Sequence, residues 1–144
     1  MIVVDANLLL YAHDAGSAHH LPARRWLEKI LSGHEPVGLA WTAVLAFLRV
    51  GTNSRLRRDA PGVDEAIAIV GGWLERPIVT LLNPGERHWE ILRKLLTTGQ
   101  ARGPLVTDAH LAALAIEHGA ALATTDRDFA RFPGLTFFNP LDAD

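Results

Sequence analysis

Short apolar runs alternate along the chain with longer segments in which apolar residues recur every three or four positions. The short runs predict five buried strands, over residues 1–4, 37–40, 78–82, 121–124 and 135–138. The longer segments predict helices over residues 7–12, 18–32, 42–50, 63–75, 83–96 and 109–116. Because strands alternate with helices and no two-residue hairpin signal is present, we predict an α/β fold with a parallel sheet covered on both faces.

Capping residues set some of the expected helix boundaries. Thr42 is expected to cap the third helix. The stretch Asn83-Pro84-Gly85-Glu86 is typical of a helix start, with Asn83 as the cap and proline at the first helical position. The helix that follows is expected to bury Trp89. Gly119 is expected to end the helix before the fourth strand.

Composition favours one ordinary globular domain over residues 1–144. The chain is 49% hydrophobic, carries a net charge of −2 and shows neither an internal repeat nor a linker. It has no cysteine, which excludes disulfides and thiolate metal sites. Every apolar run is shorter than the roughly 20 residues that span a bilayer. Because we also find no signal peptide, we expect a cytoplasmic protein without membrane attachment.

Acidic residues follow several of the apolar segments. Asp5 follows the first strand, Asp108 follows Leu105-Val106, and Asp126 and Asp128 follow the fourth strand. Because the carboxyl ends of parallel strands meet at one edge, these acids are expected to converge although about a hundred residues separate them. Converging carboxylates repel one another, and a divalent cation relieves that cost. Oxygen ligands suit Mg²⁺ or Mn²⁺, and such sites serve phosphoryl transfer.

Each acid taken singly also has a purely structural explanation. Asp5 is a suitable helix cap, Asp108 suits a first helical turn behind Thr107, and Asp126-Arg127-Asp128 suits a turn. Their shared position at one sheet edge favours the metal site. A phospho-acceptor signalling domain also has acids at strand ends. It requires a lysine after a late strand, whereas both lysines of this chain fall in predicted helices.

Four stretches resemble one known family in order and spacing: Val4–Asp14, Leu45–Asn53, Val106–Ala112 and Leu122–Phe129. Over nearly its whole length the chain resembles PIN-domain ribonucleases, specifically the VapC-type toxins of bacterial toxin–antitoxin pairs. The resemblance implies a PIN-like, three-layer α/β/α domain with a five-stranded parallel sheet. It also implies an endoribonuclease that depends on Mg²⁺ or Mn²⁺, a VapB-like antitoxin and a homodimer.

Roles for individual residues follow from the same resemblance. It implies that Asp5, Asp108 and Asp126 are catalytic metal-site acids, that Asp128 is a weaker member, and that Asn7 and Thr107 orient ligands or water. One position departs from the family. Members usually carry a glutamate three residues before the arginine that matches Arg49, and here that position is Ala46. We hypothesise that the remaining acids hold at least one metal, with another acid or a water in the gap. The alternative is a non-catalytic PIN-like module that binds RNA or a partner.

Arginines supply the local positive charge that RNA phosphates require. Four lie within ten residues: Arg49, Arg55, Arg57 and Arg58. RNA contact, a dimer interface and a solvated face all remain open for this cluster. The sequence does not indicate which RNA is bound.

Overall fold

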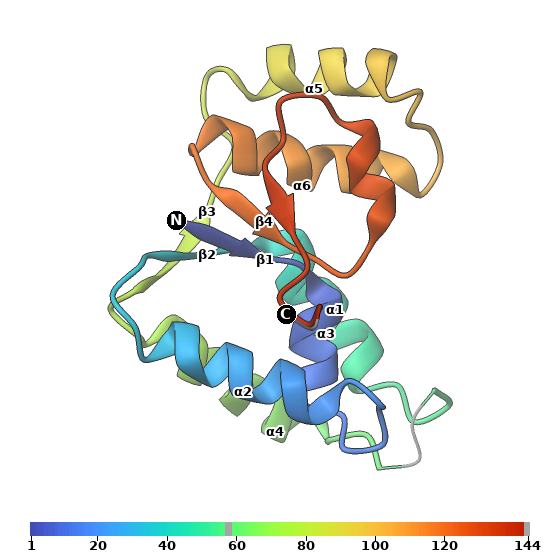
Figure 1. The fold of residues 1–144 in the computed structure, drawn as a ribbon. Coiled ribbons are helices and arrows are strands. Elements are labelled where there is room, and N and C mark those ends of the chain that lie inside the picture. The colour runs from blue at the N-terminus through green and yellow to red at the C-terminus, as the bar shows by residue number, and fades with distance from the viewer. Residues whose placement is uncertain (57–58, 143–144) are drawn as a thin grey trace.

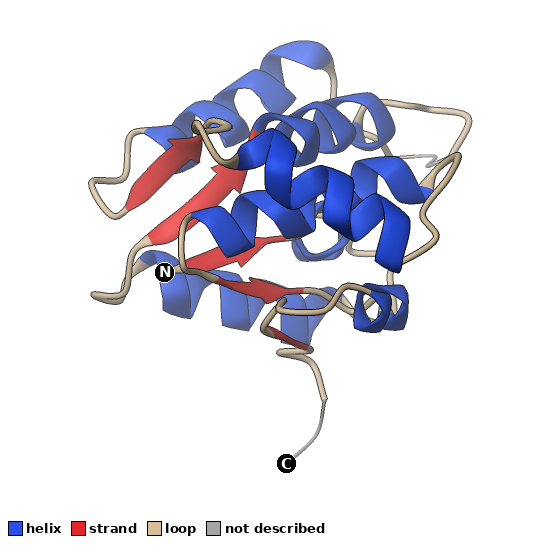
Figure 2. Cartoon of the chain, turned by 90° about the horizontal axis from the view of Figure 1, so that it is seen from above, coloured by secondary structure: helices blue, strands red, loops and turns tan. Residues whose placement is uncertain are grey.

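A single parallel sheet lies at the centre of the fold. The structure is a computed structural model that describes residues 1–56 and 59–142. Within that range, five strands pair in the order β3-β2-β1-β4-β5, all parallel. The strands are β1 (Ile2–Val4), β2 (Val37–Ala40), β3 (Val79–Leu82), β4 (Ala121–Ala123) and β5 (Phe137–Phe138). In Figure 2, β5 is the short strand nearest the C-terminus, at one edge of the sheet.

Helices cover both faces of this sheet and complete three layers (Figure 1). One layer contains α1 (Ala6–Ala12), α2 (His20–Leu31), α3 (Trp41–Gly51) and α4 (Val63–Leu74). The other contains α5 (His88–Thr98) and α6 (Leu105–Glu117), followed by the short 3₁₀ helix η1 (Arg127–Arg131). The predicted α/β/α architecture with a five-stranded parallel sheet is therefore confirmed.

The hydrophobic core is divided by the sheet into two parts. Val4 packs with the α1–α4 layer and Val3 packs with the α5–α6 layer, and both side chains are fully buried. This division follows from the strand geometry, because successive side chains point to opposite faces. Because apolar side chains cover both faces of β1, polar side chains can reach solvent only at the end of this strand.

The strand order creates a crevice between β1 and β4. The chain places β2 and β3 on one side of β1 and then crosses over to place β4 on the other side. Ligands of open α/β sheets bind outside the carboxyl ends of the strands at such a switch point. Asp5 directly follows β1, and Asp126 follows β4 by three residues. The topology therefore brings these two acids to the place where binding is expected.

The predicted start of the fifth helix was wrong. The helix α5 begins at His88, five residues after the expected cap Asn83. The backbone N–H groups of Gly85 and Arg87 donate to the Glu117 carboxylate on α6, at 2.8 and 3.0 Å. The N–H groups of this stretch thus donate to a side chain that is distant in sequence, and residues 83–87 form a loop instead of a helical turn. Trp89, which was expected in the core, is 67% exposed on α5.

Other predicted boundaries shift by fewer residues. Thr42 does not cap the third helix, because α3 begins one residue earlier, at Trp41. Asp108 lies in the first turn of α6, which begins at Leu105, rather than after a strand. The stop at Gly119 is confirmed: its φ is 63°, and the N–H of Ala120 bonds back to the carbonyl of Ala115 at 2.8 Å. Over the described residues, none of the helices combines the length and apolar character that crossing a membrane requires.

Candidate active site

Asp5 is held at the carboxyl end of β1 by a partner from β4. Its backbone N–H extends the sheet by donating to the carbonyl of Ala123 at 3.0 Å. The Thr124 hydroxyl donates to Asp5 Oδ2 at 2.7 Å, and Thr124 is only 2% exposed. Burial raises the pKa of the Asp5 carboxyl, and the hydrogen bond from Thr124 opposes this rise. Asp5 stands at the N-cap position of α1, yet its side chain makes no capping hydrogen bond, so the capping explanation fails.

Asp108 is half-buried in the first turn of α6 and has the most perturbed carboxyl of the site. Burial, and next the carboxylates of Asp126, Asp5 and Asp128, raise its pKa to about 6, whereas Arg131 acts in the opposite direction. A first-turn position near the helix N-terminus normally favours a carboxylate. The raised pKa of Asp108 therefore means that burial and the neighbouring acids affect this carboxyl more strongly than the N-terminus of α6 does.

Asp126 caps η1 and is fixed on two sides. Its Oδ1 accepts from the N–H of Asp128 at 2.8 Å, and its own N–H donates to the Thr124 hydroxyl at 3.0 Å. The turn-and-cap explanation thus holds for Asp126, but it does not exclude a second role, because the other carboxylate oxygen is not used by the cap. Thr124 connects Asp5 to Asp126, so one buried hydroxyl positions two of the predicted metal-site acids.

A cavity of about 190 Å³, here called the acid cavity, brings the predicted residues together. Its lining contains three of the predicted acids, both predicted orienting residues and the substituted position: Asp5, Asp108, Asp126, Asn7, Thr107 and Ala46, with Thr42 and Leu111 among the others. Asp128 is exposed on η1 and is not among the described lining residues. Its charge is one of the causes that raise the pKa of Asp108. A larger hollow of about 540 Å³ between α1, α2 and α4 contains none of the described acids of this set.

Ala46 lies at the wall of the acid cavity. Within the described part of the chain, the lining holds no acid besides Asp5, Asp108 and Asp126, so no carboxylate from elsewhere replaces the glutamate expected at this position. Over the same described range, no group of three or more His, Asp or Glu side chains is arranged so that it would hold a metal ion as it stands. Asp5, Asp108 and Asp126 face the same cavity, but their carboxylates are not arranged around one common point.

The donor set nevertheless fits a hard divalent cation. The cavity presents carboxylate, hydroxyl and amide oxygens, which are the ligands that Mg²⁺ and Mn²⁺ prefer. The raised pKa of Asp108 comes partly from repulsion by the other carboxylates, and a bound cation would remove that repulsion. The electrostatics of the cavity therefore favour occupation by positive charge.

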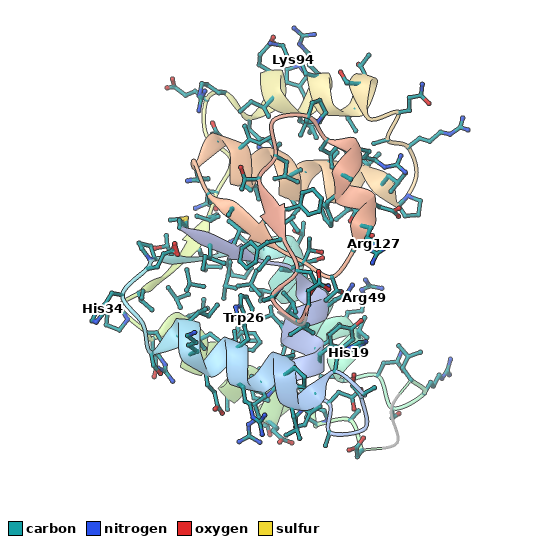
Figure 3. The ribbon with its side chains drawn as sticks, viewed as in Figure 1. His19, Trp26, His34, Arg49, Lys94 and Arg127 are labelled. Carbon is teal, nitrogen blue, oxygen red and sulfur yellow. The ribbon has the colours of Figure 1, made fainter. Side chains whose placement is uncertain are left out.

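Neither Arg49 nor Arg55, the two predicted RNA-contacting arginines that the structure describes, lines the acid cavity. Arg49 is exposed in the last turn of α3, on the side of the molecule where the strands end, and Arg127 reaches the same side from η1 (Figure 3). Arg55 is exposed, and its N–H donates to Asn53 Oδ1 at 3.0 Å within a turn. Arg57 and Arg58 lie outside the described residues. The sequence did not single out Arg127 for RNA contact.

Two threonines were missed as parts of the site. Thr42 was interpreted as a helix cap, and Thr124 as the end of a strand, yet the first lines the acid cavity and the second holds Asp5. The signal for Thr124 was present in the sequence, because a hydroxyl one or two residues before a strand-end acid can reach the neighbouring strand end. Thr42 had no comparable signal.

The chain is similar to a known domain family, to curated proteins and to solved structures. The family model described as the PIN domain matches residues 2–135. Ribonuclease VapC37 of Mycobacterium tuberculosis is 46% identical over 140 residues, which is 97% of this chain and 97% of that protein. The structure of M. tuberculosis VapC20, titled a Sarcin-Ricin loop cleaving toxin, superposes with a TM-score of 0.67 at 20% identity, covering 94% of this chain and 99% of VapC20. A toxin-antitoxin complex from Klebsiella pneumoniae gives 0.66 at 16% identity, covering 97% and 98%.

Proposed function

The chain belongs to the PIN domain family, and from this premise we propose that it is a VapC-type toxin that cleaves RNA phosphodiester bonds with the help of a divalent cation. The match to the PIN domain confirms the resemblance found in the sequence. The relative at 46% identity is named a ribonuclease and covers the same length of chain. We propose further that residues 1–144 form one such domain.

One observation carries this proposal: three acids from distant parts of the chain face the same small cavity at the switch point of the sheet. The raised pKa values of Asp5 and Asp108 show that their carboxylates are held at an electrostatic cost. Perturbed carboxyls that share a cavity are typical of functional sites. A purely structural role would not require three of them to face one space.

Asp5, Asp108 and Asp126 would hold the cation, and Asp128 would strengthen binding through its charge. A bound Mg²⁺ or Mn²⁺ would supply activation of a water molecule for attack on phosphorus and stabilisation of the leaving oxygen. Thr124 keeps the Asp5 carboxylate pointed at the cavity through the 2.7 Å hydrogen bond. Asn7 and Thr107 line the same space and would orient the remaining ligands.

Ala46 reduces the number of carboxylates that this cavity offers, but no observation favours a non-catalytic module over the enzyme. The three remaining acids keep the charge that a cation requires. The expected consequence of Ala46 is weaker cation binding, with water in the place of the absent side chain. A nuclease with one firmly held cation is compatible with this arrangement.

RNA would approach the cavity past the arginines at the strand-end side. Arg49 and Arg127 are both exposed there (Figure 3), and Arg55 follows α3 in an exposed turn. These charges attract phosphates that the net charge of −2 would otherwise repel. Arg131 has another role, because it donates to the carbonyls of Gly99 and Asp128 at 3.1 and 3.3 Å.

A VapB-like antitoxin is the partner that we propose, together with a second copy of the chain as a homodimer. The similarity in fold to a chain of a toxin–antitoxin complex supports the first of these. An arginine from such a partner could pair with the acid cavity, because carboxylates accept bidentate hydrogen bonds from a guanidinium group.

Cleavage of single-stranded RNA with added Mg²⁺ or Mn²⁺ tests the proposed function. We expect the wild type to cleave and both Asp5→Asn and Asp108→Asn to lose at least 100-fold in rate, because each removes a charge from the cavity. Asp64→Asn is the matched control, since Asp64 is exposed in the first turn of α4 and its change should leave the rate unaltered. Cleavage that persists in EDTA, or in both site variants, would overturn the proposal.

A further inference from the structure

A second hollow adjoins the acid cavity and shares Asp126 with it. This hollow, here called the edge pocket, has a volume of about 250 Å³ and is lined by Thr125, Asp126, Arg127, Phe138, Asn139 and Asp142, with a few neighbours. It lies where β4 and the edge strand β5 end. Hydrogen bonds to Asp128 and Thr124 hold Asp126 at the boundary between the two spaces. Because Asp126 lines both spaces, a substrate held at the acids would have the edge pocket beside it.

Phe138 gives the edge pocket an accessible aromatic ring. Its neighbour Phe137 also lines the edge pocket but packs against the α5–α6 core, and the alternation of a strand turns Phe138 to the opposite face. Phe138 is 37% exposed at the edge of the sheet. An exposed aromatic ring beside a nuclease site is the surface on which unpaired nucleobases stack.

Carboxylates in the same pocket favour a neutral base over a phosphate. Asp126 and Asp142 both line it, and two negative charges repel an anion. Asn139 holds this wall in place, because its Nδ2 donates to Asp142 Oδ1 at 3.1 Å and its Oδ1 accepts from the Leu141 N–H at 2.9 Å. The second oxygen of Asp142 can accept from an exocyclic amine, as acids do from cytosine N4.

We propose that the edge pocket binds one unpaired nucleobase of the RNA substrate, stacked on Phe138 with its exocyclic amine directed at Asp142, beside the phosphate that is cut. This inference rests on the proposed function and adds to it a source of base preference. Arg127, exposed at the same pocket, would contact the phosphate that joins the two nucleotides. Cytosine is therefore preferred over uracil at one position next to the cut.

Steady-state cleavage of single-stranded oligonucleotides that carry cytosine or uracil at each position flanking the cut tests this pocket. In Phe138→Leu we expect KM to rise about tenfold with a smaller change in kcat, because a base–aromatic stack contributes about 1–3 kcal/mol. Phe138→Trp should keep the wild-type KM. Asp142→Asn should lose the preference for cytosine while keeping the KM for the uracil substrate. Trp89→Leu, which removes an exposed aromatic ring from α5, is the matched control.

Binding of an oligonucleotide containing 2-aminopurine separates failure of this inference from failure of the nuclease. When the base leaves its stacked neighbours for the ring of Phe138, its fluorescence should rise in the wild type, because stacking between bases quenches 2-aminopurine, and this rise should be absent in Phe138→Leu. If the wild type cleaves RNA but Phe138→Leu matches Trp89→Leu in KM, base preference and fluorescence, the inference about the edge pocket is wrong and the proposed nuclease function is kept. If no RNA is cleaved, the proposed function fails, and the fluorescence of the wild type and Phe138→Leu decides whether the edge pocket binds a base. Should Phe138→Leu unfold, an unchanged cytosine preference in Asp142→Asn overturns the proposal.

Discussion

The Thr124 hydroxyl donates a 2.7 Å hydrogen bond to the Asp5 carboxylate across 119 residues of sequence. The same oxygen accepts from the backbone N–H of Asp126 at 3.0 Å. A single buried group therefore joins the ends of β1 and β4 and sets the positions of two acids. Val4 and Ala123, which precede Asp5 and Thr124 in the chain, are paired in the sheet. The pairing of β1 with β4 therefore places the Thr124 hydroxyl beside Asp5.

Thr124→Val should destabilise the fold, because it keeps the shape of the side chain but removes both hydrogen bonds. Asp5 would lose its donor inside a buried site, at a cost of about 1–3 kcal/mol in the free energy of unfolding. Urea denaturation at pH 7.5 in EDTA measures this cost. Thr136→Val, at an exposed position, is the control and should change the unfolding free energy by less than about 0.5 kcal/mol. Equal stability of the two variants would mean that the bond to Asp5 contributes nothing.

The stability of the protein in EDTA should depend on pH through Asp108. Its pKa is raised from 3.8 to about 6 by burial and by the neighbouring carboxylates. The folded protein therefore binds this proton more tightly than the unfolded chain, so the stabilisation is complete below about pH 4 and is lost as the pH rises through about 6. The raised pKa of Asp5 acts in the same direction.

Thermal unfolding between pH 4 and pH 8 in EDTA tests this dependence. The wild type should lose more stability than Asp108→Asn over the interval, because the variant lacks the titrating group. A saturating concentration of Mn²⁺ should reverse the trend, since the cation favours the ionised carboxylates. Parallel curves for the two proteins in EDTA would contradict the origin of the pKa shift.

Periodicity predicted the layers of this fold, but contacts distant in sequence decided its local boundaries. Strands of two to four residues could be predicted because each lies in a short apolar run. The start of α5 was missed because its preceding N–H groups bond to Glu117, about thirty residues later. Trp89 was assigned to the core by its type, whereas α5 packs on one face only and leaves that position outside.

The acids of the site could be predicted because each stands at the end of an apolar segment, and the parallel topology then brings such ends together. Asp108 does not follow a strand but lies in the first turn of α6, as its structural explanation predicted. The sequence carried a signal for Thr124, but only the register of β4 beside β1 shows that its hydroxyl reaches Asp5. The edge pocket could not be predicted, because it depends on the exact register of β4 beside β5. The roles of the site residues stay predictions until variants are measured.

Gly85→Ala should loosen the loop between β3 and α5. A Cβ at Gly85 would lie 2.5 Å from Glu117 Oε2 and 3.0 Å from its Cδ, so the carboxylate would have to move and release the N–H groups of Gly85 and Arg87. We expect a loss of about 1–2 kcal/mol in unfolding free energy. Gly71→Ala is the control, because nothing surrounds that position within 4 Å in helix α4, and it should stabilise by about 0.5–1 kcal/mol.

A double-mutant cycle with Glu117→Ala identifies the cause of this loss. If the clash with the Glu117 carboxylate is responsible, Gly85→Ala should cost clearly less in the Glu117→Ala background, because both the clashing carboxylate and its hydrogen bonds to the loop are then absent. Additive effects of the two changes would place the strain elsewhere in the loop.

Ala46→Glu should convert the acid cavity into a tighter cation site. Ala46 lines the cavity with Asp5, Asp108 and Asp126, so a glutamate there adds a fourth carboxylate that can reach the same space. In Mn²⁺ titrations followed by calorimetry we expect the affinity to rise at least tenfold over the wild type.

In EDTA the Ala46→Glu variant should be less stable than the wild type, because a further negative charge joins carboxylates that already repel one another. Ala46→Gln, of equal size and without charge, separates the effect of charge from that of volume and should give neither the gain in affinity nor the loss of stability in EDTA. If Ala46→Gln and Ala46→Glu bind Mn²⁺ equally, the cavity does not bind the cation through carboxylate charge, and the assignment of these acids as its ligands is wrong.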